Sequence, residues 1–310
     1  MGPAYEQNDR PGDRIQLRLA PLRDLPRFAG MEVVHTIPEL RAAVARARQA
    51  GKAIGFVPTM GCLHEGHLSL IRRAKKEAAF VVVSIFVNPT QFGPNEDFSK
   101  YPRTFEDDRQ GCDGAGADVI FAPSAADFYP AGASTWVDVE GVSAKLCGEF
   151  RPGHFRGVAT VVAMLFNAAQ ADVAVFGRKD LQQLAVIRHM VRDLHIPVRI
   201  VAHETVREPN GVAMSSRNRY LSAEQLTQAT AIPAAMAAAK ALAQTGVTDA
   251  VRLRDAALAV LAAQSALKLQ YCEIIDLETM APVATTAGFS CAIAIACHLG
   301  ATRLIDNADL

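Results

Sequence analysis

The sequence predicts an α/β protein: a Rossmann-like, doubly wound parallel sheet followed by a smaller C-terminal α+β domain. Short apolar runs alternate with segments of helical spacing between residues 53 and 202, which is typical of parallel strands joined by helices. The run 80–87 is continuous and rich in β-branched residues, as expected of a strand covered on both faces. Polar motifs follow several of these runs, at the edge where open parallel sheets bind ligands.

Three parts are expected along the chain. Residues 1–30 hold several Gly and Pro residues among many charges and are expected to form a flexible extension. Residues 31–205 are expected to form the Rossmann-like domain that carries the site, and residues 206–310 a smaller domain that acts as a lid.

The elements of the larger domain follow in order. Pro38 suits the first turn of a helix that opens at Thr36–Glu39 and that Gly51 ends. The strands are predicted at 53–57, 80–87, 118–122, 172–176 and 197–202, where apolar runs end in turn residues. The helices between them are predicted at 66–78, 104–115, 157–169 and 180–194.

The elements of the smaller domain are fewer. Ser222–Gln225 has the pattern of a capping box that starts a helix. Ala-rich segments at 229–244 and 249–264 are expected to be helical, and apolar runs at 267–276 and 289–298 are expected to be strands.

Composition narrows the function class. Lys+Arg and Asp+Glu are both 32, so the net charge is zero, which argues against broad nucleic-acid or membrane-surface binding. No apolar run reaches membrane-spanning length. The six cysteines are scattered and form no C-x-x-C pair, so free thiols in a reducing cytoplasm are expected.

The segment 57–67 is the strongest chemical signal. His64 and His67 lie three residues apart at a predicted helix start, where they can face one side and where free backbone N–H groups favour an anion. Phosphate binding fits this pattern. A metal pair completed by Cys62, or a simple helix cap, fits it as well. The segment is neither a Walker loop nor a dinucleotide fingerprint.

Two further polar segments follow strands. Residues 177–183 combine a glycine, cations, a carboxylate and two amides at a helix start. Lys179 can neutralise a phosphate, and Asp180 can accept from ribose hydroxyls or cap the helix. Gln91 follows the strand at 80–87, and its amide can bind a carboxylate and a hydroxyl together. Plain capping and loop roles remain alternatives for all three.

Taken together, the segments resemble the pantoate–β-alanine ligase family of HIGH-type nucleotidyltransferases. Residues 58–67 are similar to the family's Pro-Thr-Met-Gly-x-Leu-His-x-Gly-His, and residues 177–183 to its Gly-x-Lys-Asp-x-Gln-Gln. Residues 88–92, 151–157 and 214–218 match Asn-Pro-x-Gln-Phe, Arg-Pro-Gly-His-Phe-x-Gly and Met-Ser-Ser-Arg-Asn. Arg178 departs from the usual Glu or Gln, and is expected either to strengthen phosphate binding or to face solvent.

The resemblance implies the site residues. His64, His67 and Lys179 would be catalytic, and Gln91 and Gln183 would hold pantoate. ATP would be bound by Met60, Gly61, Cys62, Leu63, His64, Glu65, Gly66, His67, Gly177, Arg178, Lys179, Asp180, Val206, Met214, Ser215, Ser216 and Arg217. No protein metal site is implied, because Mg²⁺ would accompany the ATP phosphates. Asp107 and Asp108 are expected to be exposed helix acids, with Mg²⁺ binding as the alternative.

The resemblance also implies an activity. (R)-pantoate, β-alanine and ATP would give pantothenate, AMP and diphosphate through a pantoyl adenylate, in pantothenate biosynthesis. The protein would be a cytoplasmic homodimer without nucleic-acid or membrane partners. Three other functions stay open from the residues alone: a nucleotidyltransferase acting on a phosphorylated substrate, a metal hydrolase using His64 and His67, and a nucleotide-binding regulator.

Overall fold

The computed structural model describes residues 30–94, 96 and 98–310. The extension predicted at residues 1–30 lies outside this range except for Gly30. In the described part of the chain, no helix has both the length and the apolar character needed to cross a membrane.

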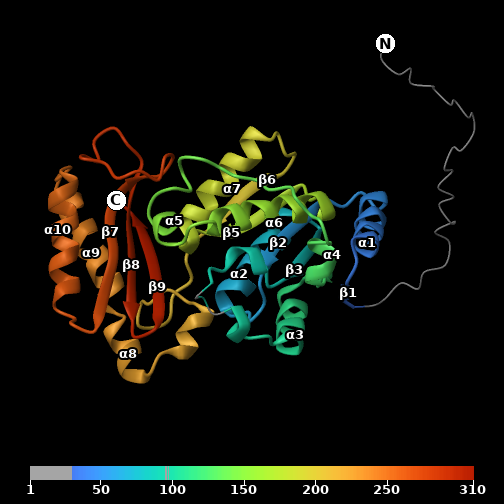
Figure 1. The fold of residues 1–310 in the computed structure, drawn as a ribbon, viewed down its shortest axis with the longest axis horizontal. Coiled ribbons are helices and arrows are strands. Elements are labelled where there is room, and N and C mark those ends of the chain that lie inside the picture. Colours follow the sequence, from blue (N-terminus) through green and yellow to red (C-terminus); the bar gives the residue numbers. More distant parts are fainter. Residues whose placement is uncertain (1–29, 95, 97) are drawn as a thin grey trace, which may run out of the picture.

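Six parallel strands form the larger sheet (Figure 1). They are β1 (Glu32–Val34), β2 (Ile54–Thr59), β3 (Phe80–Ile85), β4 (Val119–Phe121), β5 (Val173–Gly177) and β6 (Arg199–His203), in the spatial order β1-β4-β3-β2-β5-β6. From β2 the chain moves outward through β3 and β4 on one side, and later through β5 and β6 on the other. The direction of winding therefore reverses between β2 and β5, which is where doubly wound sheets bind ligands. The predicted fold class is confirmed.

Helices cover both faces of this sheet. One face packs against α1 (Ile37–Gln49), α6 (His154–Ala169) and α7 (Leu181–Asp193), and the other against α2 (Glu65–Glu77) and α3 (Phe105–Ala115). Adjacent strand residues divide between the two cores, with Phe56 in one and Val57 in the other, because successive side chains alternate between faces. Two short helices, α4 (Ala125–Phe128) and α5 (Cys147–Phe150), lie in the connection before α6.

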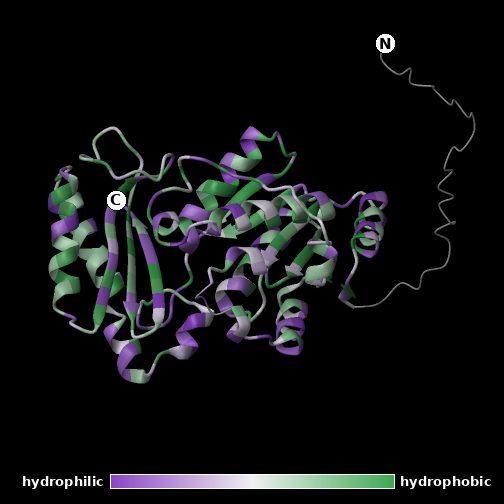
Figure 2. Cartoon of the chain, in the orientation of Figure 1, coloured by the Kyte–Doolittle hydropathy of each residue, from purple (hydrophilic) through white to green (hydrophobic). Residues whose placement is uncertain are grey.

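A second, antiparallel sheet lies beside the first. It consists of β7 (Leu267–Asp276), β8 (Cys291–Leu299) and β9 (Thr302–Asp309), and it shares a core with α9 (Ala231–Gln244) and α10 (Ala250–Ala262). The short helix α8 (Ala223–Gln228) is largely hydrophilic (Figure 2). Ser222 starts α8 with the predicted capping box. The division of the chain into domains near residue 205 stays a prediction.

Differences from the predicted elements have local causes. β2 continues through Pro58, because its pairing with β5 ends at Phe56 and leaves no ladder bond there for the missing N–H. The strands β1 and β9 were not predicted; β1 has three residues and β9 carries charged and polar residues, so neither has a strong apolar pattern.

Candidate active site

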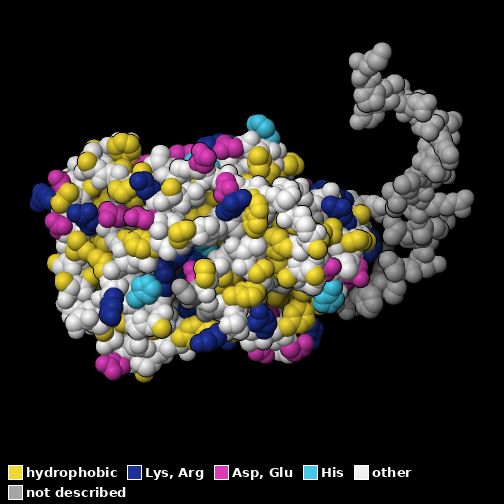
Figure 3. All heavy atoms as spheres, in the orientation of Figure 1, with side chains coloured by type: hydrophobic (Ala, Val, Ile, Leu, Met, Phe, Trp, Pro, Cys, Tyr) yellow, Lys and Arg dark blue, Asp and Glu magenta, His cyan; other side chains and the backbone are white. Residues whose placement is uncertain are grey.

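A cleft of about 720 Å³ lies between the turn that follows β5 and the C-terminal sheet. Basic side chains gather around the hollow between the two parts of the molecule (Figure 3). Those that line the cleft come from both parts: Lys100, Arg151, Lys179, Arg217 and Arg303. A cleft lined in this way suits a polyanionic ligand.

The histidine motif forms the turn from β2 into α2. His64 is the N-cap of α2, and its Nδ1 accepts the backbone N–H of Gly66 at 3.1 Å. The Nδ1 of His67 accepts the backbone N–H of His64 at 3.4 Å. Since both Nδ1 atoms are acceptors, each neutral ring carries its hydrogen on Nε2. The pair therefore offers two N–H donors beside the start of a helix.

Both histidines are neutral near pH 7. Burial, followed by the positive charges of Lys179 and Arg219, lowers the pKa of His64 to about 4. Burial, followed by His64 and Lys179, lowers the pKa of His67 to about 3. The neutral rings offer hydrogen-bond donors and no positive charge.

Gly66 leaves space for the first of these rings. A Cβ on Gly66 would lie 2.8 Å from Cε1 and 2.9 Å from Nδ1 of His64, closer than non-bonded atoms allow. A side chain at this position would displace the His64 ring from its capping contact.

The Asp108 side chain fixes the backbone of the turn between β2 and α2. It is only 2% exposed, and its carboxylate accepts the backbone N–H groups of Cys62 at 2.9 Å and Leu63 at 2.7 Å. Cys62 has a φ of 51°, a conformation that a non-glycine residue adopts only when its surroundings hold it. The expectation of an exposed acid is wrong for Asp108, because these unpaired N–H groups draw its side chain inward. Asp107 is exposed as expected.

Gln91 follows β3 in a short 3-10 turn, Pro89–Gln91. Its side-chain oxygen accepts from Asn88 Nδ2 at 3.1 Å, and its Nε2 donates to the Met60 sulfur at 2.9 Å. The turn packs closely on α6: a Cβ on Gly157 would lie 2.4 Å from the Thr90 carbonyl oxygen. Gln91 is therefore only 9% exposed and fixed in orientation.

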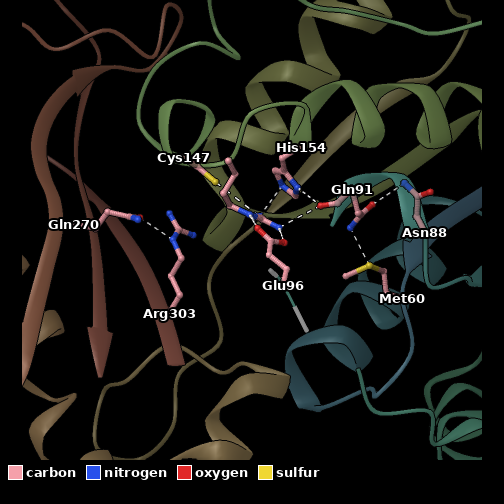
Figure 4. Close-up of polar contacts among 9 residues, drawn as sticks. Met60, Asn88, Gln91, Glu96, Cys147, His154, Gln270 and Arg303 are labelled. Atoms are coloured by element: carbon pink, nitrogen blue, oxygen red, sulfur yellow. Dashed lines mark hydrogen bonds and ion pairs between the residues drawn. The ribbon is translucent and has the colours of Figure 1, made fainter. Parts of the chain in front are cut away.

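A partly buried ion pair supports the Gln91 backbone (Figure 4). Arg151 binds both carboxylate oxygens of Glu96, at 2.6 and 2.5 Å. Arg151 also donates to His154 Nε2 at 3.0 Å, so the hydrogen on His154 Nδ1 is donated to the Gln91 carbonyl at 2.8 Å. Burial, followed by the charge of Arg151, lowers the pKa of His154 to about 4.

Lys179 and Asp180 lie in the 3-10 turn Arg178–Asp180 between β5 and α7. Asp180 faces the cleft and has protein on its other sides. Desolvation by that protein raises the pKa of its carboxyl, but the positive charges of Lys179 and Arg217 have the larger combined effect and lower the pKa overall. Its side chain makes no helix-capping hydrogen bond. Arg178 lies outside the cleft lining and forms an ion pair with Asp309 of β9. Neither role expected for Arg178 describes this contact, because its guanidinium joins the two sheets.

The segment 206–218 supplies part of the cleft wall through Val212, Ala213, Ser215, Arg217 and Asn218. Met214 N donates to the Val206 carbonyl at 3.0 Å, and the following turn is capped by Ser215, which accepts from Arg217 N at 3.3 Å. Arg207 ties the segment to β9 by donating to the buried Asp306 at 2.6 and 3.1 Å.

The predicted residues fall into two groups. Those that line the cleft are Lys179, Asp180, Gln183, Ser215 and Arg217. The others lie outside its lining: Met60, Gly61, Cys62, Leu63, His64, Glu65, Gly66 and His67 in the β2–α2 turn and the start of α2, Gln91 after β3, Gly177 and Arg178 beside Lys179, and Val206, Met214 and Ser216 in the segment 206–218. His64 and His67 are close enough to the cleft that the charges of Lys179 and Asp180 shift the pKa of both rings.

Several cleft residues were not predicted. Gln270, Tyr271, His298 and Arg303 line it from the C-terminal sheet, and Glu96 from the connection after β3. The Arg303 Nε donates to Gln270 at 2.8 Å (Figure 4). Single polar residues within strands give no local signal, so only the tertiary structure places them in the site.

Comparison with known proteins supplies the family. The profile of the family described as pantoate-beta-alanine ligase matches residues 32–309. The chain is 51% identical to a pantothenate synthetase of Geobacter sulfurreducens over 280 residues, which is 90% of this chain and 99% of that protein. It is 50% identical to the Moorella thermoacetica pantothenate synthetase, again over 90% of this chain and 99% of that protein.

Solved structures agree with the sequence comparison. A pantothenate synthetase of Thermus thermophilus superposes with a TM-score of 0.86 at 46% identity, covering 90% of this chain and 99% of that chain. A pantoate-beta-alanine ligase of Francisella tularensis, solved in complex with beta-gamma ATP and β-alanine, superposes with a TM-score of 0.73 at 34% identity over 90% and 97%. The chain described here belongs to the pantoate–β-alanine ligase family.

Proposed function

We propose that the cleft carries out the ATP-dependent condensation of (R)-pantoate with β-alanine, giving pantothenate, AMP and diphosphate. The observation that carries this proposal is that the His64–His67 pair, Gln91, and Lys179 with Gln183 follow the carboxyl ends of β2, β3 and β5, which are neighbours in the sheet. The relatives named as pantothenate synthetases, and the Francisella tularensis ligase solved with beta-gamma ATP and β-alanine, support the choice of substrates.

The first step is attack of the pantoate carboxylate on the α-phosphorus of ATP. A P–O bond forms as the bond to diphosphate breaks, which leaves pantoyl adenylate. The negative charge that develops on the phosphates meets the Nε2–H donors of His64 and His67 and the cations of Lys179 and Arg217. Donors and cations already in place at the developing charge lower the barrier most effectively.

Gln91 and Gln183 are proposed to hold pantoate. Gln183 lines the cleft on the first turn of α7, and Gln91 is fixed by Asn88 and Met60. An amide supplies both a donor and an acceptor, so the pair can bind a carboxylate and hydroxyls together. Fixing the carboxylate in line with the α-phosphorus supplies the proximity that the reaction needs.

The second step is attack of the β-alanine amine on the acyl carbon. The C–N bond forms, AMP leaves, and the amine loses a proton to reach the neutral amide. A mixed anhydride hydrolyses readily, so water must be kept out of the site. We propose that the C-terminal part, residues 206–310, acts as a lid and brings Ser215, Ser216 and Arg217 over the phosphates.

Mg²⁺ is proposed to reach the site on the ATP phosphates. Among the described residues, no cluster of three or more His, Cys, Asp or Glu side chains is arranged to hold a metal ion. Three of the described acids line the cleft: Glu96 and Asp306 form ion pairs with arginines, whereas the Asp180 carboxylate makes no helix-capping hydrogen bond. Asp180 is therefore the acid best placed to bind Mg²⁺. One carboxylate together with phosphate oxygens and water is a common Mg²⁺ environment.

We also propose that the enzyme is a cytoplasmic homodimer without nucleic-acid or membrane partners. All six cysteines are buried free thiols, which suits a reducing compartment. The homodimer is implied by the family resemblance, and the mass of the protein in solution by light scattering tests it.

The test of function is an assay of AMP release with ATP, Mg²⁺, pantoate and β-alanine, omitting one component at a time. AMP and pantothenate formed only with the complete mixture support the proposal. ATP–diphosphate exchange that needs pantoate, without use of β-alanine, would keep the adenylation step and reject the acceptor. Hydrolysis without ATP, together with stoichiometric zinc, would favour the metal hydrolase.

A further inference from the structure

The strand β9 contacts the turn that carries Lys179. Asn307 of β9 is 7% exposed, and its Nδ2 donates to two backbone carbonyls, that of Arg178 at 2.9 Å and that of Lys179 at 3.0 Å. The amide thus reaches from the C-terminal sheet to the end of β5 in the larger sheet.

The two carbonyls belong to the peptide groups on either side of the Lys179 Cα. Each peptide group is planar, so the orientation of the two planes determines φ and ψ at the residue between them. These two angles set the direction in which the Cα–Cβ bond leaves the backbone. By binding both carbonyls, the buried Asn307 amide therefore fixes the direction of the Lys179 Cα–Cβ bond.

The Lys179 ammonium has no comparable constraint of its own. Within the described part of the chain, Lys179 Nζ forms no hydrogen bond or ion pair, and the side chain lines the cleft. A lysine stem is long and flexible, so the position of its charge depends strongly on how the backbone presents it. The contact with Asn307 is the buried polar contact that fixes this backbone.

We propose that Asn307 is a positioning residue that aims Lys179 at the ATP phosphates. The inference rests on the proposed role of Lys179. The neighbouring residue of β9 acts in parallel: Asp306 is 4% exposed and binds Arg207, at the start of the segment that carries Ser215 and Arg217. Consecutive residues of one strand thereby hold the two segments that carry Lys179 and Arg217.

A double-mutant cycle between Asn307 and Lys179 tests the proposal. Asn307→Asp keeps the size of the side chain but replaces the N–H donors with oxygens that repel the two carbonyls. We expect it to lower kcat about 10- to 100-fold, with the KM for β-alanine unchanged. Lys179→Ala, costly in the wild type, should cost little more in the Asn307→Asp background, because misplacement has already removed its contribution.

Asp309→Asn is the matched control. It lies two residues along β9 and removes the charged partner of Arg178 while leaving the Asn307 amide in place. We expect wild-type kinetics from it. If Asn307→Asp does not fold, Asn307→Ser, which keeps one donor, enters the same cycle with a smaller expected loss.

Independent, multiplicative losses from the Asn307 and Lys179 substitutions would overturn the proposal, as would an equal loss from Asp309→Asn. Lys179→Ala with unchanged activity would instead reject the role of Lys179 in the proposed function, and with it this inference. The two failures are therefore distinguishable.

Discussion

His64 and His67 lie with their ring centroids 4.1 Å apart at the start of α2, and each Nδ1 accepts a backbone N–H. This arrangement determines their chemistry before any ligand binds. Both rings are held as Nε2–H tautomers, and burial lowers both pKa values far below neutrality. They are suited to donate hydrogen bonds to phosphate, whereas Lys179 and Arg217 supply the charge.

Loss of one of these donors should impair adenylation. We expect His67→Ala to lower kcat/KM for ATP by about 10²- to 10³-fold, as for removal of one donor from a developing anion. His67→Gln, which keeps an N–H donor, should retain more activity. The measurement is AMP release at saturating pantoate and β-alanine.

His35→Ala is the control for this substitution, because His35 is exposed and bonds the Ala122 carbonyl away from the cleft. Equal losses from His35→Ala and His67→Ala would contradict a specific role for His67.

Asp108 and Asp107 form a matched pair for the anchoring of the histidine turn. Asp108→Asn leaves one backbone N–H of the Cys62–Leu63 pair without its carboxylate partner. We expect a loss of about 1–3 kcal/mol in the free energy of unfolding and a raised KM for ATP. Asp107→Asn changes an exposed residue and should leave both unchanged. Urea denaturation and initial rates measure the two effects, and identical behaviour of the two variants would refute the anchoring role.

Gly157 tests the coupling between α6 and the Gln91 turn. A methyl group at Gly157 would overlap the Thr90 carbonyl, so Gly157→Ala should push the turn away. We expect a raised KM for pantoate and a destabilisation of roughly 1–3 kcal/mol. Gly114→Ala in α3 meets no atom within 4 Å and should be neutral or slightly stabilising. An unchanged pantoate KM in Gly157→Ala would show that the close packing does not position Gln91.

His154 gives a prediction for stability against pH. Its pKa is lowered from 6.5 to about 4, so as pH falls below 6.5 the unfolded chain binds a proton that the folded chain does not. The stability from this group is fully present above that pH and is lost as pH falls towards 4. Allowing for solvent near the half-buried ring, the loss is roughly 1–2 kcal/mol.

Urea denaturation at about pH 7.5 and about pH 5 measures this loss. The free energy of unfolding should fall less between the two pH values in His154→Gln than in the wild type. His64 and His67, whose pKa values are also lowered, contribute in the same direction in both proteins. An equal fall in both proteins would contradict the buried, neutral state of His154.

Local patterns were sufficient for much of the fold. The apolar run at Phe80–Ile85, the helix start at Thr36 and the capping box at Ser222 are fixed by neighbouring residues, and the structure has them where the sequence placed them. The spatial order of the strands was not readable, because it depends on contacts between distant segments. β9 was missed because two consecutive buried residues, Asp306 and Asn307, are polar and interrupt its apolar pattern.

The same distinction applies to the site. The motif residues could be selected because their spacing along the chain is characteristic, although their roles remain proposals. Asp108 and Asn307 act on other segments through backbone groups, and a single acid or amide in a helix or strand carries no signal of that action. Arg178 was noticed, but its partner Asp309 lies 131 residues away in sequence.

Transfer of an oxygen atom tests the central claim most directly. Pantoate labelled with ¹⁸O in its carboxylate is turned over with ATP, Mg²⁺ and β-alanine, and the products are analysed by mass spectrometry. Attack of the carboxylate on the α-phosphorus predicts AMP carrying a single ¹⁸O atom from pantoate. Unlabelled AMP, or label in inorganic phosphate with formation of ADP, would contradict the adenylate mechanism assigned to this cleft.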